Sequence, residues 1–326
     1  MNFYTYARHY GNDILFRGVK DGKRVTAKHE FKPTLFVKRA DRPSEYKSIY
    51  GDEVHPIQFE NNKAATEFFD TYKDVENYPI FGQNYYAYQY ITEKYPGEIK
   101  WDAKGLLIYS IDIETTSEGG FPNVDSPSEK VLVITLQNNN TKKITTFGLG
   151  EFTPTKETSH LDVDYIGFDS EEKLLDSFLT WWQENCPDII TGWNSNLFDM
   201  PYLITRVQRV LGENEHKRFS PFKLINKRPI RFAAGREMTA FEITGVAQLD
   251  YLDLYKKFTY VTRESYKLDF IAETELGKNK LESGFDTFKE FYEGDWNRFV
   301  EYNIIDTVIV DELEDKMKLI ELAITM

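Results

Sequence analysis

The chain has 326 residues, 41% of them hydrophobic and 15% aromatic, and a formal net charge of −13. This length suggests about two domains, and the composition is typical of a globular protein rather than a disordered one. No apolar run reaches the roughly 18–20 residues of a membrane-spanning helix, and we expect neither a secretion signal nor a membrane partner. The single cysteine, Cys186, excludes a disulfide within the chain and a cysteine-rich zinc site, so we expect a reducing, cytoplasmic location.

Residues 1–103 are predicted to form a small, strand-rich α+β domain. Short runs of β-forming residues occupy 2–8, 13–19, 24–31 and 34–39, and turn-forming residues separate them. Residues 61–74 carry apolar side chains at helical spacing, which predicts one amphipathic helix. The remaining residues, 104–326, are predicted to form a second domain.

The second domain is expected to open with LLIYSIDIETT, residues 106–116, which reads as a buried strand. Because side chains alternate along a strand, Asp112 and Glu114 should point the same way, opposite to Ile111 and Ile113. Two like charges on one largely buried face are unfavourable, since burial and mutual repulsion both disfavour ionisation. Either the strand has reached its polar end, or these carboxylates bind a divalent metal ion together with acids from elsewhere.

Strands and helices are predicted to alternate in the next part of the chain. The segments KVLVITL (130–136) and KKITTFGL (142–149) read as strands. An amphipathic helix should follow over 170–186, with Asp169 and Ser170 as its cap. This pattern predicts an α/β domain with its sheet covered on both faces.

Residues 187–212, PDIITGWNSNLFDMPYLITRVQRVLG, predict a short strand followed by a helix. Asp199 stands where the helix should begin, and Pro201 falls in its first turn, where a missing N–H is tolerated. Leu203, Val207 and Val210 form the apolar stripe of this helix. Helix capping by itself would explain Asp199, so a functional role is one of two interpretations.

Net negative charge argues at first sight against a nucleic-acid partner. Basic residues nevertheless concentrate in one segment, as Arg206, Arg209, Lys217, Arg218, Lys223, Lys227, Arg228, Arg231 and Arg236. Such a run is usually a solvated charged face. In an otherwise acidic chain, a surface that faces phosphates is a serious alternative.

The last predicted helix, residues 295–324, carries one acid within its apolar stripe. The stripe consists of Phe299, Tyr302, Asp306, Ile309, Leu313, Met317 and Ile320. Tyr302 lies one turn before Asp306 on the same face. A buried lone aspartate is unfavourable, so Asp306 belongs either to a structural salt bridge or to a site that uses its charge.

Together, Asp112, Glu114, Asp199, Tyr302 and Asp306 resemble the DEDD exonuclease pattern in its tyrosine variant. The three motifs would be the Asp-x-Glu of SIDIETT, the Asn-x-x-x-Phe-Asp of residues 194–199 and the Tyr-x-x-x-Asp of YNIID. The whole chain resembles the N-terminal and 3′→5′ exonuclease region of a family B DNA polymerase of the T-even-type large tailed phages. FKPTLFVK, GWNSNLFDMPY, LDYLDLYKKF and YNIID carry this resemblance, which extends over nearly the full chain.

The resemblance implies a ribonuclease H-like exonuclease domain, in which helices flank a mixed central sheet. It also implies two divalent metal ions, Mg²⁺ or Mn²⁺. Asp112 would bridge the ions, Glu114 and Asp306 would complete the first site, and Asp199 would serve the second. Tyr302 would hold the attacking water with help from Glu114.

Further DNA contacts are implied by the same resemblance. Asn194 and Phe198 would position a frayed 3′ strand. A basic hairpin would help to partition the primer between synthesis and editing, through Lys223, Lys227, Arg228, Arg231 and Arg236. The expected substrate is single-stranded DNA or the 3′ end of a primer–template.

The polymerase palm motifs of the family are missing from these 326 residues. The palm, fingers and thumb region would therefore be a partner if it is separately encoded or has been removed, and a replication clamp is another expected partner. The protein would be phage-encoded and act in the host cytoplasm. Two other functions stay open, an RNA-trimming exonuclease of the same fold and a non-catalytic regulatory module that binds nucleic acid.

Overall fold

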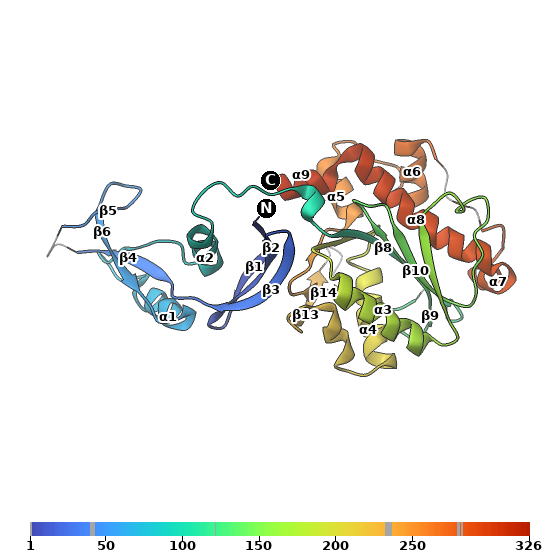
Figure 1. The fold of residues 1–326 in the computed structure, drawn as a ribbon, viewed down its shortest axis with the longest axis horizontal. Helices are drawn as coiled ribbons and strands as arrows, with labels where there is room; N and C mark the ends of the chain where they lie inside the picture. Colours follow the sequence, from blue (N-terminus) through green and yellow to red (C-terminus); the bar gives the residue numbers. More distant parts are fainter. Residues whose placement is uncertain (1, 40–42, 121, 232–236, 279–280, 282) are drawn as a thin grey trace. The chain divides into compact units, whose positions relative to one another are not determined.

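The computed structural model describes residues 2–39, 43–120, 122–231, 237–278, 281 and 283–326. The chain divides into two compact units, Met1–Gly105 and Leu106–Met326 (Figure 1). Within the described part of the chain, each helix is too short or too polar to cross a lipid bilayer.

The described residues of the first unit form two antiparallel sheets, two α-helices and a 3-10 turn. One sheet has the order β1-β2-β3 and the other the order β5-β6-β4-β7. The strands are β1 (Phe3–Tyr10), β2 (Asp13–Lys20), β3 (Lys23–Glu30), β4 (Thr34–Lys38), β5 (Tyr46–Lys47), β6 (Glu53–Gln58) and β7 (Ile80–Phe81). The helices are α1 (Asn62–Tyr72), α2 (Tyr86–Lys94) and the 3-10 turn η1 (Ala103–Gly105). The strand-rich character predicted for this region is confirmed.

A mixed six-stranded sheet forms the centre of the second unit, in the order β11-β10-β9-β8-β12-β15. The strands are β8 (Ile108–Thr115), β9 (Val131–Asn138), β10 (Ile144–Leu149), β11 (Val163–Phe168), β12 (Ile189–Thr191) and β15 (Ala247–Gln248). Strand β9 runs antiparallel to β8 and β10, whereas β12 runs parallel to β8 and β15. A separate hairpin joins β13 (Ile225–Arg231) to β14 (Glu237–Ile243).

Helices cover both faces of this sheet (Figure 1). Helices α3 (Glu171–Asn185) and α4 (Asp199–Val210) pack on the face that carries Ile111 and Ile113, and α8 (Trp296–Met317) packs on the other. The remaining helices are η2 (Glu215–Phe219), α5 (Tyr251–Phe258), α6 (Leu268–Leu276), α7 (Phe288–Gly294) and α9 (Leu319–Thr325). The prediction of a ribonuclease H-like fold, with a mixed sheet between helices, is confirmed.

The last helix differs from its prediction in one respect. Lys318 adopts a left-handed conformation with φ of 57°, so the chain breaks there into α8 and α9. Ile320 therefore lies on a different helix from Asp306, and the stripe predicted to run through Ile320 ends within α8. An L residue rarely continues a right-handed helix from this conformation, which explains the break.

Candidate active site

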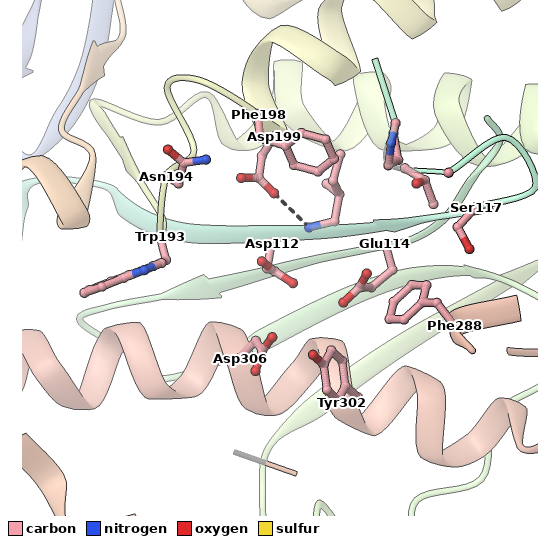
Figure 2. A pocket seen from close by; sticks show the side chains of 14 residues that line it. Asp112, Glu114, Ser117, Trp193, Asn194, Phe198, Asp199, Phe288, Tyr302 and Asp306 are labelled. Carbon is pink, nitrogen blue, oxygen red and sulfur yellow. Dashed lines mark hydrogen bonds between the residues drawn. The ribbon is translucent and has the colours of Figure 1, made fainter. Parts of the chain in front are cut away.

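Three elements of the second unit meet at one cavity of about 460 Å³ (Figure 2). Strand β8 contributes Asp112 and Glu114, the start of α4 contributes Asp199, and α8 contributes Tyr302 and Asp306. The structure thus brings together all four acids and the tyrosine that the sequence singled out. The other lining residues are Ile113, Thr115, Ser117, Gly120, Pro122, Trp193, Asn194, Phe198 and Phe288.

The alternation of side chains along β8 directs its acids toward α8. Ile111 and Ile113 are buried in the core beneath α3 and α4, whereas Asp112 and Glu114 are half-buried on the opposite face. Both acids lie inside the paired strand, since Asp112 is opposite Thr135 of β9. Their position therefore does not reflect a strand that has run out into solvent.

Three of the carboxylates are close enough to share a cation. Asp112, Glu114 and Asp306 each place one oxygen within 4.8 Å of the other two. Asp306 is only 4% exposed. Carboxylate oxygens are the ligands that Mg²⁺ and Mn²⁺ prefer, and like charges this close repel one another in the absence of a cation. The donor set therefore fits a hard divalent ion.

Asn303 fixes the orientation of the central acid. Its Nδ2 donates a hydrogen bond of 2.6 Å to Oδ2 of Asp112, and the side chain of Asn303 is fully buried. Sequence reasoning missed this residue, although it follows Tyr302 directly within YNIID. The hydrogen bond links residues 191 positions apart, which no local pattern reveals.

Asp199 begins α4, but it is not the helix cap. Phe198 occupies the N-cap position without a side-chain cap, and Asp199 is the first helical residue. Oδ1 of Asp199 instead accepts a hydrogen bond of 3.2 Å from the backbone N–H of Ile113. The capping interpretation of Asp199 was therefore wrong, because Phe198 occupies the N-cap position and the side chain of Asp199 accepts a hydrogen bond from β8.

The surroundings of Asp199 disfavour its charged form. Burial raises the pKa of its carboxyl, and the acids Asp250 and Asp306 raise it further, whereas backbone N–H groups lower it. Asp199 lines the cavity beside the group formed by Asp112, Glu114 and Asp306 without belonging to that group. A cation bound next to Asp199 would offset the unfavourable burial of its charge.

The loop between β12 and α4 places Asn194 and Phe198 on the cavity wall. Asn194 has a left-handed backbone with φ of 67°, and Asp250 stabilises this turn. Oδ1 of Asp250 accepts from the N–H of Asn194 at 3.1 Å, and Oδ2 accepts from the N–H of Asn196 at 2.9 Å. Burial raises the pKa of Asp250 to about 6. Sequence reasoning did not single out this aspartate.

Glu129 is a second acid that sequence reasoning missed. It stabilises residues 116–119, on the side of the cavity opposite Asn194 (Figure 2). Its Oε1 accepts from the N–H of Gly119 at 3.0 Å, and its Oε2 accepts from the N–H of Glu118 at 3.2 Å and from the hydroxyl of Thr116. These hydrogen bonds lower the pKa of Glu129. Ser117, which lies between Thr116 and Glu118 in the sequence, lines the cavity.

The basic segment is not one continuous surface. Arg206 is buried and pairs with Glu171 at 2.7 Å, and Arg218 pairs with Asp176, so these two arginines are structural. The hairpin predicted from Lys223 onward is present as β13 and β14.

Four of the five hairpin residues proposed from the resemblance are exposed. They are Lys223, Lys227, Arg228 and Arg231, and none of them lines the carboxylate cavity. Lys227 lies 3.9 Å from Asp125, and Arg231 lies 3.4 Å from Glu237. The fifth, Arg236, falls outside the described residues.

Comparison with known proteins agrees with this geometry. The model of the family "DNA polymerase family B, exonuclease domain" matches residues 85–271. The DNA-directed DNA polymerases of Escherichia phage RB69 and Enterobacteria phage T4 are 30% and 31% identical to the chain, over 99% of its length. The DNA polymerase catalytic subunit of Gallid herpesvirus 2 is 27% identical over 67% of the chain and 19% of its own length.

The chain belongs to the family B DNA polymerases and contains their exonuclease domain. The resemblance to the polymerases of T-even-type phages is thereby confirmed. The chain spans 38% of the length of these two phage relatives. An exonuclease domain of this family acts on DNA and uses divalent metal ions, which the acidic donor set accommodates.

Proposed function

We propose that this chain is the proofreading part of a phage DNA polymerase, a 3′→5′ exonuclease that removes 5′-mononucleotides from single-stranded or frayed DNA. One observation carries the proposal: three carboxylates from two opposed layers converge within 4.8 Å, with Asp199 and Tyr302 on the same cavity. The unit Leu106–Met326 would be the exonuclease domain, and Met1–Gly105 the N-terminal domain.

Each acid has a role in binding two Mg²⁺ or Mn²⁺ ions. Glu114 and Asp306 would hold one ion and Asp199 the other, with Asp112 shared between them. Support comes from the place of Asp112, which β8 presents between Glu114 and the Asp199 end of the cavity (Figure 2). When bound, a pair of divalent ions activates water and neutralises charge on the scissile phosphate.

Tyr302 is proposed to hold the attacking water. Its ring lies on α8 one turn before Asp306 and faces the cavity beneath Glu114 (Figure 2). Two phenylalanines of α7, Phe288 and Phe291, contact the ring edge to face, with centroids 6.3 and 5.6 Å away. These contacts hold the ring of Tyr302 in place, and Glu114, which lines the same cavity, would assist its hydroxyl.

The terminal nucleotide would lie in the cavity between the loop that carries Asn194 and residues 116–119. Asn194 offers an amide to its sugar or base, and Phe198 offers an apolar surface. The ring of Phe198 is supported by Tyr202, with centroids 5.6 Å apart. Exposed basic side chains of the hairpin, such as Arg228, would contact the phosphate backbone further along the strand.

The family resemblance implies two partners beyond the substrate. A palm, fingers and thumb region would supply the polymerase activity, and a replication clamp would hold the complex on DNA. We place this activity in the cytoplasm of the infected host.

Digestion of single-stranded DNA labelled at its 5′ end tests the proposal. In Mg²⁺ the labelled strand should shorten stepwise and release nucleoside 5′-monophosphates, and chelator should stop the reaction. Asp112→Ala should abolish it, and Tyr302→Phe should weaken it less, since a hydroxyl that orients water is one contribution of several. Release of 3′-phosphates, or unchanged digestion by Asp112→Ala, would reject the assignment.

The same assay separates the two alternative functions. An RNA-trimming enzyme would digest RNA of the same sequence faster than DNA. A non-catalytic module would bind the strand and leave it intact, whichever divalent metal ion is added. The converging acids argue against such a module, because binding a polyanion gains nothing from clustered negative charge.

A further inference from the structure

The N-terminal unit contains a second cavity, of about 290 Å³, with three basic side chains in its wall. It lies against the β1-β2-β3 sheet and the end of α2, and no acidic residue is among its described lining residues. These are Asn2, Phe16, Val19, Lys20, Val25, His29, Lys94 and Tyr95. The hydrolysis proposed above uses none of them.

Lys94 brings an uncompensated positive charge to this cavity. Its Nζ lies 3.6 Å from the centroid of the Phe16 ring and donates a hydrogen bond of 2.6 Å to the hydroxyl of Tyr90. Burial and the charge of Lys20 both lower the pKa of Lys94. In the described part of the chain, no carboxylate forms an ion pair with Lys20 or Lys94. Two like charges thus face one cavity without a counterion.

His29 completes the wall of the cavity with its imidazole ring. Its ring stacks on Tyr90 with centroids 5.6 Å apart, and this packing fixes its orientation. The Nε2 atom of His29 is buried and has no hydrogen-bond partner among the described residues. Because this atom is closed to solvent, His29 contributes the surface of its ring to the cavity wall, and the charge of a ligand would be met by Lys20 and Lys94.

The rest of the cavity wall is apolar. Phe16, Val19 and Val25 belong to the sheet, and Tyr95 follows α2, with its ring 6.2 Å from that of Tyr4. A bare inorganic anion would leave this surface without a contact. A ligand with a flat apolar body and a doubly charged group would use both halves of the wall.

We propose that this cavity binds the 5′-phosphomonoester of a nucleoside, with the phosphate at Lys20 and Lys94, beside the ring of His29, and the base against Tyr95 and the two valines. A phosphomonoester carries close to two negative charges at neutral pH, which matches the two ammonium groups. The net charge of −13 repels anions in general, so such binding must depend on this local cluster. The ligand is either a free mononucleotide or the phosphorylated 5′ end of a strand.

Isothermal titration calorimetry of the full chain with 5′-AMP tests the proposal. The titration is done in chelator and in the Asp112→Ala background, so that the carboxylate cavity holds no metal. We expect one saturable site, with adenosine and inorganic phosphate each binding about tenfold or more weakly than 5′-AMP. Equal binding by inorganic phosphate would overturn the nucleoside part of the proposal, and equal binding by adenosine would overturn the phosphate part.

Charge variants locate the site. Lys20→Glu, at an exposed position, should weaken 5′-AMP binding about tenfold or more, and Lys94→Gln should do the same. Lys100→Glu makes the same charge change at an exposed position of this unit that does not line the cavity, and it should bind like the parent. If Lys94→Gln does not fold, the 5′-AMP affinities of Lys20→Glu and Lys100→Glu are compared instead, and this comparison is sufficient by itself. Unchanged affinity in Lys20→Glu overturns the proposal.

A 5′-phosphorylated trinucleotide distinguishes the two ligand sources. Affinity equal to that of 5′-AMP identifies a strand end, and no binding identifies a free mononucleotide. In either case the imidazole NMR signals of His29 should shift with 5′-AMP, and the absence of any shift would contradict the position given to the phosphate.

Discussion

Asp112 is oriented by a side chain from the opposite layer of its unit. The β8 strand brings its carboxylate to the cavity, and Asn303 of α8 donates the hydrogen bond that selects one rotation of that carboxylate. Residues that orient metal ligands in this way typically contribute 10–100-fold to metal affinity or activity. Asn303 therefore acts as a positioning residue for the proposed reaction.

Replacing Asn303 by Ala should lower the exonuclease rate by about 10–100-fold and raise the metal concentration needed for half-maximal activity. The acids themselves remain, so excess Mn²⁺ should restore part of the rate. Asn297→Ala is the matched control, because this asparagine of the same helix contacts Thr153 instead. Equal rates in the two variants would mean that Asp112 needs no support from Asn303.

The raised pKa of Asp250 predicts how the free energy of unfolding depends on pH. Burial raises the pKa of Asp250 to about 6 in the folded state, against about 3.9 in an unfolded chain. The folded state thus binds the proton more tightly, so the free energy of unfolding falls as pH rises from about 4 to about 6, by up to roughly 3 kcal/mol. Above that range the contribution of Asp250 is constant.

The difference in unfolding free energy between the parent and Asp250→Asn, from urea titrations in chelator, isolates this effect. The advantage of the parent should shrink as pH rises through this range and then level off, because Asn does not titrate. Asn should also be less stable overall, since its amide cannot accept from both Asn194 and Asn196. If the stability advantage of the parent grows with pH, the N–H donors stabilise the charged form of Asp250 by more than burial destabilises it.

Two of the cavity residues that the sequence singled out are marked by a local conflict, and the others were indicated by the family resemblance. An acid in an apolar strand or stripe, such as Asp112 or Asp306, stands out against its neighbours and is brought to the site by the regular period of its element. Asp250, Asn303 and Glu129 carry no such conflict. Their roles come from hydrogen bonds to residues distant in sequence, which only the folded chain brings together.

At the scale of elements, α8 shows how far a hydrophobic stripe can predict burial. The stripe through Phe299 and Asp306 is correct, yet Glu301 and Asp311, which lie off it, are also buried. Glu301 accepts from Thr155 and Thr158, and Asp311 pairs with Lys142 at 2.8 Å. A helix packed on several sides buries polar residues wherever loops supply partners, and a single apolar face cannot reveal this.

Replacing Asp306 by Asn separates a metal site from a structural ion pair on α8. In chelator the parent carries mutual repulsion among Asp112, Glu114 and Asp306, so the variant should melt about 2–4 °C higher for each kcal/mol of repulsion removed. Added Mn²⁺ should raise the melting temperature of the parent more than that of the variant. A variant that melts lower in chelator, with neither protein responding to Mn²⁺, would place Asp306 in a structural ion pair instead.

The β13–β14 hairpin is the element that we expect to bind the DNA backbone. Replacing Lys227, Arg228 and Arg231 together by Gln should weaken binding of single-stranded DNA. The slope of log affinity against log salt should become shallower by about 0.7 for each phosphate that the hairpin no longer neutralises. Replacing Lys63, Lys100 and Lys156, which are exposed elsewhere, makes the same change in net charge. Identical slopes for the two triple variants would exclude the hairpin from the interface.

For the whole molecule, the order of strands and helices along the chain was largely predictable. Apolar residues repeat about every two positions in the strands and about every three to four in the helices, and the two patterns alternate clearly in the sequence. The sheet order β11-β10-β9-β8-β12-β15 was not, since it depends on pairings such as β8 with β12 that lie about 80 residues apart. The family resemblance implied a mixed central sheet between helices, and the order of its strands comes from the structure alone. The cavity in the N-terminal unit had no signal in sequence, because Lys20, His29 and Lys94 come from three separate elements.

Acidic residues are spread over the whole chain, so divalent ions could in principle bind at many places, and hydrogen exchange in the presence of Mn²⁺ shows where they do. A ligand that binds only the folded state suppresses local opening around its site. We expect protection in peptides covering 108–115, 194–202 and 299–308, which carry the cavity acids. Peptides covering 3–38 should be unchanged, as should 140–149, where Lys142 already neutralises Asp311. Protection confined to other acidic segments would show that the converging carboxylates are not the metal centre, whatever the family predicts for them.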